Sequence, residues 1–224
     1  MGIAVTSHDN NALGALDISN LEITNEVYTL GTTGSTQRNI GDTGTNIRVQ
    51  QVQEGKWMVR SGGEDIGGNE DSFGFFDSEQ TGDIVASMHV DKIVHRDVGA
   101  RRNMNAKGGL MFRASHAADA PHVSLLVHSG SGVTMYYRTT AGGETISKNV
   151  GVMVEDVELK MEKTGNTVSC YYKHVSSPEW YHLGDASADF DTTYYVGQAI
   201  SSAQRGYWAA LYASEVQVTP AAIA

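Results

Sequence analysis

Apolar and polar residues alternate with a period of two in several segments of the chain. In residues 83–93, polar side chains such as His89 share one face, and the other face carries Ile84, Ala86, Met88 and Val90. Residues 157–162 and 168–173 show the same alternation. One polar and one apolar face is typical of antiparallel strands that pack on one side. No long stretch combines an apolar period of about 3.6 residues with helix-capping signals, so we predict an all-β domain.

Short glycine-containing segments separate the predicted strands. Residues 164–166 (TGN) lie between two of them, and residues 129–132 (SGSG) separate HVSLLVH from VTMYYR. The chain contains 25 glycines but only 3 prolines, which fits many tight turns and few strand breakers. The Gly/Thr/Asn-rich residues 31–46 are predicted to form a loop.

Composition narrows the classes of partner. At 40% hydrophobic residues, the 224-residue chain has enough apolar material for a globular core. Its formal net charge of −10 repels a phosphate backbone and an anionic membrane surface, so we predict neither nucleic acid nor membrane insertion. The single cysteine, Cys170, is expected to point inward as a small core residue. No signal peptide is visible, and both an intracellular, for example plastid, site and an extracellular surface stay open.

The first two dozen residues repeat the last two dozen. Residues 1–24 align with residues 196–219 without a gap, and seven aligned pairs are identical: Gly2/Gly197, Ala4/Ala199, Ser7/Ser202, Ala15/Ala210, Leu16/Leu211, Ser19/Ser214 and Thr24/Thr219. Each copy reads as a strand, a polar turn and a longer strand, and we predict a β-hairpin for both. The predicted organisation is an N-terminal hairpin (1–24), a linker with a first strand (25–46) and a β-sandwich (47–224).

Four segments of the body carry a family resemblance: GKWMVRSGGEDIGGNEDSFGFF, TGDIVASMHV, AKGGLMFRAS and HVSLLVHSGSGVTMYYRTTAGGE. Together they resemble the concanavalin A-like (lectin- and glucanase-like) modules repeated in large secreted bacterial and algal proteins. The resemblance covers about residues 47–219 and the first 24. It implies a two-sheet antiparallel β-sandwich of the jelly-roll class. One departure is that Ile66 precedes Gly67-Gly68, where the family often has an aromatic residue.

The sequence favours a non-catalytic protein. Glycosidases of this fold use carboxylates that alternate on one strand, usually as Glu-x-Asp-x-x-Glu, and that signature is absent. On the nearest strand Lys160 stands between Glu158 and Glu162, which indicates a solvated charge pattern. No nucleophile elbow is present.

Two sets of residues are of the types that bind metal ions. The acidic loop 64–71 offers Asp65, Glu70 and Asp71 as oxygen ligands for Ca²⁺, although it lacks EF-hand spacing and also reads as a structural corner. We therefore predict no cofactor, with Ca²⁺ as the secondary possibility. His122 and His128 share one face of a strand but lie roughly 20 Å apart, too far to share a metal, and are predicted to be exposed.

Aromatic residues with polar neighbours are the candidate sugar-binding groups. They are Tyr136, Arg138, Trp180 and Trp208. Trp208 is the freest of them, because its counterpart in the first copy of the repeat is Leu13.

Two functions from different classes follow. The first is a structural protein that assembles with itself through sheet edges and the N-terminal hairpin into a lattice, tube or filament, in loose resemblance to algal shell-forming proteins such as the diatom pyrenoid coat. The hairpin residues for such contacts are Ile3, Val5, Leu13, Leu16, Ile18, Leu21 and Ile23. The extra hairpin could alternatively end a preceding module or pair within its own domain. The second function is a carbohydrate-binding module of a larger secreted protein, with a polysaccharide as partner.

Overall fold

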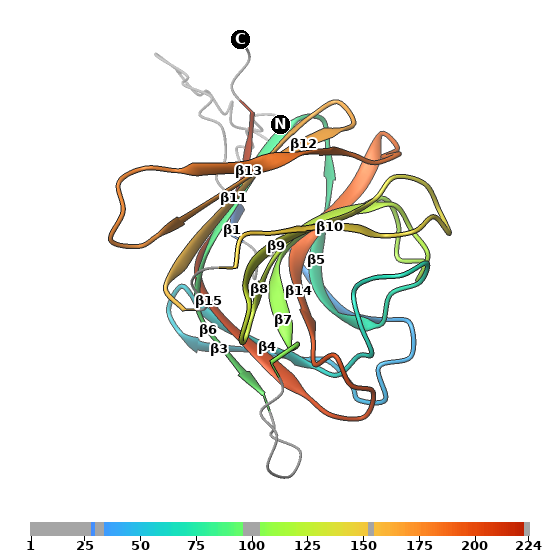
Figure 1. The fold of residues 1–224 in the computed structure, drawn as a ribbon, viewed down its shortest axis with the longest axis vertical. Helices are drawn as coiled ribbons and strands as arrows, with labels where there is room; N and C mark the ends of the chain where they lie inside the picture. Colours follow the sequence, from blue (N-terminus) through green and yellow to red (C-terminus); the bar gives the residue numbers. More distant parts are fainter. Residues whose placement is uncertain (1–27, 30–33, 96–103, 152–154, 222–224) are drawn as a thin grey trace, which may run out of the picture.

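A computed structural model describes residues 28–29, 34–95, 104–151 and 155–221. Within these ranges the chain forms strands and no helix, and so none of the described segments is a helix that could cross a membrane. The strands build two antiparallel sheets that face each other (Figure 1). The predicted all-β sandwich is confirmed.

Sheet A is the eight-stranded sheet. Its strands follow the order β13-β12-β11-β6-β15-β4-β3, and β1 pairs with the C-terminal half of β15. The bounds are β13 (Tyr181–Ser187), β12 (Thr167–His174), β11 (Val157–Thr164), β6 (Ile84–His95), β15 (Ala209–Pro220), β4 (Lys56–Ser61), β3 (Arg48–Gln53) and β1 (Tyr28–Thr29).

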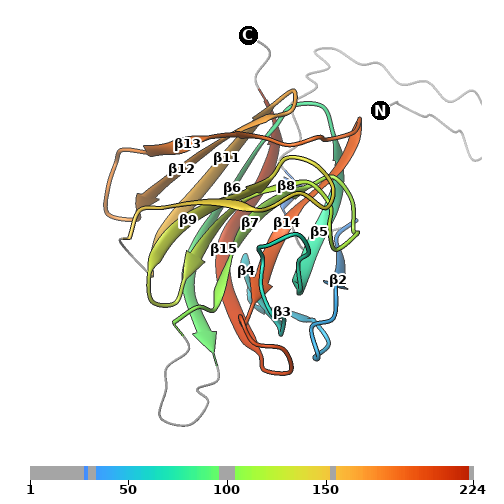
Figure 2. The ribbon, with the colours of Figure 1, turned by 45° about the vertical axis from the view of Figure 1, so that its right-hand side comes forward.

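Sheet B is the seven-stranded sheet, in the order β10-β9-β8-β7-β14-β5-β2. The bounds are β10 (Ile146–Asn149), β9 (Gly132–Arg138), β8 (His122–His128), β7 (Lys107–Arg113), β14 (Thr193–Ser201), β5 (Phe73–Thr81) and β2 (Thr36–Ile40). In Figure 2, β13 of sheet A and β2 of sheet B lie at opposite sides of the molecule.

The main core lies between the sheets. Alternating residues of β6, β11 and β12 fill it from sheet A, as the period-two pattern predicts, and the buried Cys170 is among them. From sheet B it receives residues such as Leu110, Leu125 and Val196. Trp57 packs against this core with its ring 5.8 Å from that of Phe76.

A second core covers the outer face of sheet B. The loop after β4 folds back over the sheet and inserts Ile66, which is completely buried. Apolar residues from five strands of sheet B surround this side chain; with it the cluster comprises Ile40, Ile66, Phe73, Phe75, Met111, Leu126 and Ala199. As a result β7 and β8 are buried on both faces.

The sandwich begins earlier than predicted. Residues 31–46 were expected to form a loop, but β2 lies within them and pairs with β5. The sandwich therefore includes β1 and β2, which precede residue 47. Most of β2 is exposed or half-buried, so its sequence lacks the apolar alternation that identifies a strand.

The predicted C-terminal hairpin at residues 196–219 is not a hairpin. β14 lies in sheet B between β7 and β5, whereas β15 lies in sheet A between β6 and β4. The intervening segment carries the chain from one sheet to the other, a connection that has the same strand-turn-strand pattern as a hairpin. Residues 1–24, the first copy, lie outside the described residues.

Side chains tie the two sheets together along both sides of the sandwich. On one side, Gln37 and Asn39 of β2 accept hydrogen bonds from the backbone N–H groups of Val49 and Ile47, at 3.1 Å each. On the other side, Lys148 of β10 donates to the carbonyl of Leu183 in β13 at 2.6 Å. The amide side chains of β2 thus occupy part of the free edge of β3, which limits pairing with another strand there.

Candidate functional site

The outer face of sheet B is closed by a buried ion cluster. Asp71, in the loop before β5, forms an ion pair with Arg113 of β7 at 2.6 Å. Both of its carboxylate oxygens also accept hydrogen bonds from Arg138 of β9, at 2.8 Å each. All three side chains are fully buried. Burial by itself raises the pKa of Asp71, but the neighbouring imidazole of His122 and the two guanidinium groups outweigh it, and the pKa lies below its usual value.

Arg138 fastens three loops to the sheet. Its guanidinium donates to the carbonyls of Gly143 at 3.1 Å, Ala120 at 3.1 Å and Gly68 at 3.2 Å. Sequence reasoning proposed Arg138 as a glycan contact, yet its side chain has no access to solvent. The reason is that its partner Asp71 comes from a distant loop that folds over the strand.

The histidines of β8 are buried, contrary to the prediction that they are exposed. Burial lowers the pKa of His122 to about 3 and that of His128 to about 4. Both imidazoles are therefore neutral near pH 7. They point to the outer face of sheet B, which the loops cover.

Tyr136 lies at the border of this covered face. Its hydroxyl contacts Nε2 of His128 at 2.8 Å, and its ring lies 4.9 Å from the ammonium of Lys107. Lys107 in turn forms an ion pair with Asp65. Tyr136 is only half-buried, but its polar atom is already engaged by neighbours within the protein.

Two of the three candidate Ca²⁺ ligands in the acidic loop are engaged by basic side chains. Asp65, Glu70 and Asp71 line a hollow of about 320 Å³, but Asp65 binds Lys107 and Asp71 binds the two arginines. Throughout the described ranges, no group of three or more histidine, cysteine, aspartate or glutamate side chains is placed to hold a metal ion.

The outer face of sheet A is open and carries a row of polar side chains across five neighbouring strands. Cross-strand register places Lys173, Glu158, His89, Ser214 and Lys56 side by side on β12, β11, β6, β15 and β4. Trp180, just before β13, continues the row, with its ring 5.0 Å from the ammonium of Lys173. We call these six residues the belt. At the usual strand spacing the belt is roughly 24 Å long.

Two aromatic rings stand at one end of the belt. The ammonium of Lys160 lies between them, 4.5 Å from the ring centre of Tyr171 and 5.2 Å from that of Trp180. The imidazole of His182 packs against Tyr171 at 4.9 Å. Trp180 and Tyr171 are both half-buried, so part of each side chain faces solvent.

A hollow of about 370 Å³ lies at the other end of the belt, beside a bulge in β15. Ser214 contacts Nδ1 of His89 at 3.3 Å and Asp91 at 3.4 Å, and Asp91 pairs with Lys56 at 2.9 Å. A Ser-His-Asp triad needs a carboxylate hydrogen-bonded to the ring nitrogen remote from the serine. The carboxylate on that side, Asp156, is 3.6 Å away, beyond hydrogen-bond distance. His89, Ser214 and Asp91 therefore do not form a Ser-His-Asp triad in this structure.

Of the predicted glycan-binding residues, only Trp180 and Trp208 lie on the outer face of sheet A. Trp208 is at another part of this face, and its ring lies 5.3 Å from the guanidinium of Arg60. The polar residues of the belt were missed by sequence reasoning. The alternation places each of them on the polar face of its strand, but only the order of strands shows that they form one row.

Comparison with known proteins gives the fold. A functionally unknown protein from Saccharomyces cerevisiae superposes with a TM-score of 0.62 at 16% identity, over 85% of this chain and 98% of that one. The legume lectin-like domain from Entamoeba histolytica has a TM-score of 0.51 at 8% identity, over 84% and 91% of the two chains. The fold is concanavalin A-like. A third similar structure is the exoplasmic/lumenal domain of VIP36 in a Ca²⁺/Man3GlcNAc-bound form, with a TM-score of 0.50 at 8% identity, over 85% and 84% of the two chains.

Comparison of sequences identifies no family for this chain. No family model matches the chain. No curated protein matches it.

Proposed function

We propose that the protein is a non-catalytic glycan-binding module that holds its ligand on the outer face of sheet A. The belt is the observation that carries this proposal. It combines the half-exposed ring of Trp180, next to that of Tyr171, with ammonium, carboxylate, imidazole and hydroxyl groups in one row. Sugars are bound in this way, by stacking on aromatic rings and by hydrogen bonds to polar side chains.

The charged groups of the belt favour binding over hydrolysis. Glu158 pairs with Lys173 at 3.1 Å, and Glu162 pairs with Lys160 at 2.7 Å. A glycosidase needs one carboxyl group that can donate a proton and a second that can attack or activate water. Here both carboxylates are occupied by ion pairs with ammonium groups, and in the described part of the chain neither faces a second carboxylate as its partner.

We propose further that glycan binding does not require Ca²⁺. The VIP36 structure is described as a Ca²⁺-bound form, and this description applies to that protein. In the present chain, Asp65 and Asp71 are engaged by Lys107 and by Arg113 and Arg138. Retention on polysaccharide is expected to be the same with EDTA as with Ca²⁺. Loss of retention in EDTA would show that the acidic loop binds the ion after all.

Substitution of Trp180 tests the glycan proposal. Trp180→Ala is expected to weaken retention on neutral polysaccharides by roughly 2- to 12-fold, since an aromatic contact contributes about 0.5–1.5 kcal/mol beyond the area it buries. Trp208→Ala is the matched control, because it removes an indole from the same face while leaving the belt intact. Affinity electrophoresis in a panel of soluble polysaccharides measures both variants. Equal retention of wild type and Trp180→Ala on every polysaccharide that binds would contradict the proposal.

Self-assembly is a second candidate function, favoured by the positions of β14 and β15. Both strands are flanked on two sides, so the C-terminal copy of the repeat already fills its place in this sandwich. We propose that residues 1–24, the similar first copy, pair with another sandwich. Size-exclusion chromatography of the chain with and without residues 1–24 tests this. An unchanged elution volume over a wide concentration range would contradict assembly through this segment.

A further inference from the structure

Two arginines stand directly opposite each other on the outer face of sheet A. The register pairs Arg48 of β3 with Arg60 of β4. Like charges at directly opposed positions of an antiparallel pair repel and destabilise the sheet. The two side chains therefore represent a local electrostatic cost.

The other arginines in the described part of the chain all bind carboxylates. Arg38 binds Asp77, Arg113 and Arg138 bind Asp71, and Arg205 binds Asp42. In the same part of the chain, Arg48 and Arg60 form no such ion pair. Two arginines without a carboxylate partner are unusual in a protein that has 26 acidic and 16 basic residues and a formal net charge of −10.

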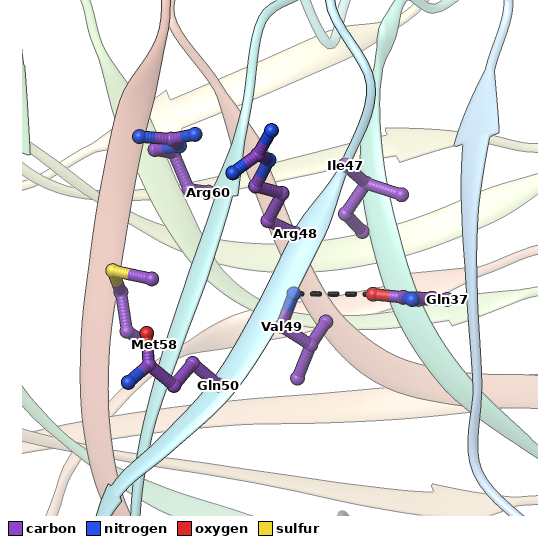
Figure 3. Close-up of a pocket in the computed structure, with 7 residues that line it drawn as sticks. All are labelled: Gln37, Ile47, Arg48, Val49, Gln50, Met58 and Arg60. Atoms are coloured by element: carbon purple, nitrogen blue, oxygen red, sulfur yellow. Dashed lines mark hydrogen bonds between the residues drawn. The ribbon is translucent and has the colours of Figure 1, made fainter.

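The two guanidinium groups stand at a hollow of about 330 Å³ at the edge of sheet A. Figure 3 shows Arg48 and Arg60 projecting to the same side, with the amide of Gln50 and the thioether of Met58 further along the two strands. The amide of Gln37 closes the hollow on the side of β2, where it accepts the N–H of Val49 (Figure 3). The ring of Trp208 lies against Arg60, which restricts where that guanidinium can go.

We propose that Arg48 and Arg60 form a binding site for an oxyanion, the carboxylate or sulfate group of an acidic glycan. A planar guanidinium fork matches the paired oxygens of either group. An anion between the two arginines replaces their mutual repulsion with two attractions. The glycan part rests on the proposed function: Lys56, the end of the belt, and Arg60 share the outer face of β4 and lie roughly 13 Å apart, so one oligosaccharide can reach both.

The first test uses small anions and needs no glycan. Sodium sulfate and sodium acetate are titrated against sodium chloride at constant ionic strength, and NMR follows the arginine Nε–Hε signals. The signals of Arg48 and Arg60 are expected to shift in a saturable way, whereas that of Arg205, which is exposed and paired with Asp42, is expected to shift only slightly. Equal shifts at all three arginines would overturn the proposal. This result does not depend on whether the protein binds glycans.

The second test uses oligosaccharides of equal length that are neutral, uronate-containing or sulfated. Arg48→Gln and Arg60→Gln are expected to weaken binding of the acidic oligosaccharides by roughly tenfold or more, the usual loss for a charge-assisted hydrogen bond, and to leave neutral binding unchanged. Arg205→Gln removes the same charge elsewhere and controls for the net charge. Equal losses in Arg205→Gln would overturn the site.

Measured with the same oligosaccharides, Trp180→Ala and the two arginine variants together separate the two proposals. If Trp180→Ala has no effect while the arginine variants lose acidic binding, the belt proposal fails and the oxyanion site stands. If the acidic oligosaccharides bind no more tightly than the neutral one, the oxyanion site fails. The uronate and the sulfated probe, compared with each other, show which of the two groups the arginines prefer.

Discussion

The two outer faces of the sandwich carry similar kinds of side chain and use them in opposite ways. On sheet B, Arg113 and Arg138 lie beneath loops and are held by Asp71. On sheet A, Arg48 and Arg60 lie at an open hollow, and charged pairs such as Lys173–Glu158 remain half-exposed. Burial with a complete set of partners makes a charge part of the scaffold, and exposure leaves it available to a ligand.

This difference indicates where a ligand can bind. On the covered face, polar groups bind partners within the protein. Arg138 donates hydrogen bonds to carbonyls of three loops, and Asp71 pairs with two arginines. The open face has a row of polar groups next to aromatic rings. We therefore propose that the face of sheet B serves stability and the face of sheet A serves recognition.

Substitution of Asp71 is expected to have the largest effect. Asp71→Ala leaves two buried guanidinium groups without their anion, and loss of one partner of a buried ion pair typically costs about 3–5 kcal/mol. Urea denaturation should show this loss in the free energy of unfolding. Asp42→Ala, which removes an exposed partner of Arg205, is the control and should leave the midpoint nearly unchanged. A similar midpoint for the two variants would contradict the structural role of the covered face.

Truncation of Ile66 should have the next largest effect. The side chain is fully buried in the second core, and truncation of such a residue to alanine costs about 2–5 kcal/mol. Ile146→Ala is the matched control, because Ile146 is 52% exposed. Differential scanning calorimetry should give a lower melting temperature for Ile66→Ala only. Equal melting temperatures would mean that the loop over sheet B contributes little to stability.

Acid should weaken the covered face through its two buried histidines. The pKa of His122 is about 3 and that of His128 about 4 in the folded protein, against an ordinary value of 6.5. Between pH 6.5 and about 4 the unfolded chain therefore binds protons at these residues that the folded chain does not. Stability is fully present above pH 6.5 and falls as the pH is lowered through this range.

The His122→Leu variant tests the contribution of one of these two histidines to the pH dependence of stability. Its free energy of unfolding, measured in urea between pH 7 and pH 4.5, should fall less steeply with acid than that of the wild type. The difference in slope approaches about 1.4 kcal/mol per pH unit, the value for one proton. The same slope in both proteins would show that His122 is protonated equally in the folded and unfolded states.

Substitutions on the open face should have the smallest effect on stability. Lys173→Gln removes a half-exposed ion pair with Glu158, and such pairs contribute less than about 1 kcal/mol. The same change should weaken glycan binding, because Lys173 lies beside Trp180 in the belt. Chemical denaturation and affinity electrophoresis together check this separation. A large loss of stability with unchanged binding would reverse the assignment of the two faces.

The sequence allowed the prediction of strands whose two faces differ. β6, β11 and β12 follow from alternation and from the turns between them, and the inward position of Cys170 follows with them. β2 was missed because a short, mostly exposed edge strand has no such pattern. The repeat segment was predicted as a hairpin because local sequence does not show whether two successive strands enter the same sheet.

The covered face could not be predicted for a different reason. Arg113, His122 and Arg138 stand at positions that alternation assigns to a polar, solvated face. Their burial depends on Asp71, which is 42 residues from Arg113 and 67 from Arg138 in the sequence. A contact over that separation leaves no signal in either local pattern. The belt was missed for the same physical reason, since its members come from six separate segments.

NMR mapping of a bound oligosaccharide tests the assignment of the two faces most directly. A neutral oligosaccharide that the protein retains is titrated into labelled protein, and backbone and side-chain signals are followed on both sheets. We predict that the largest shifts occur at Trp180, Tyr171 and Lys173 on sheet A. Shifts centred instead on Tyr136, His128 and Lys107, with the belt unaffected, would contradict the account.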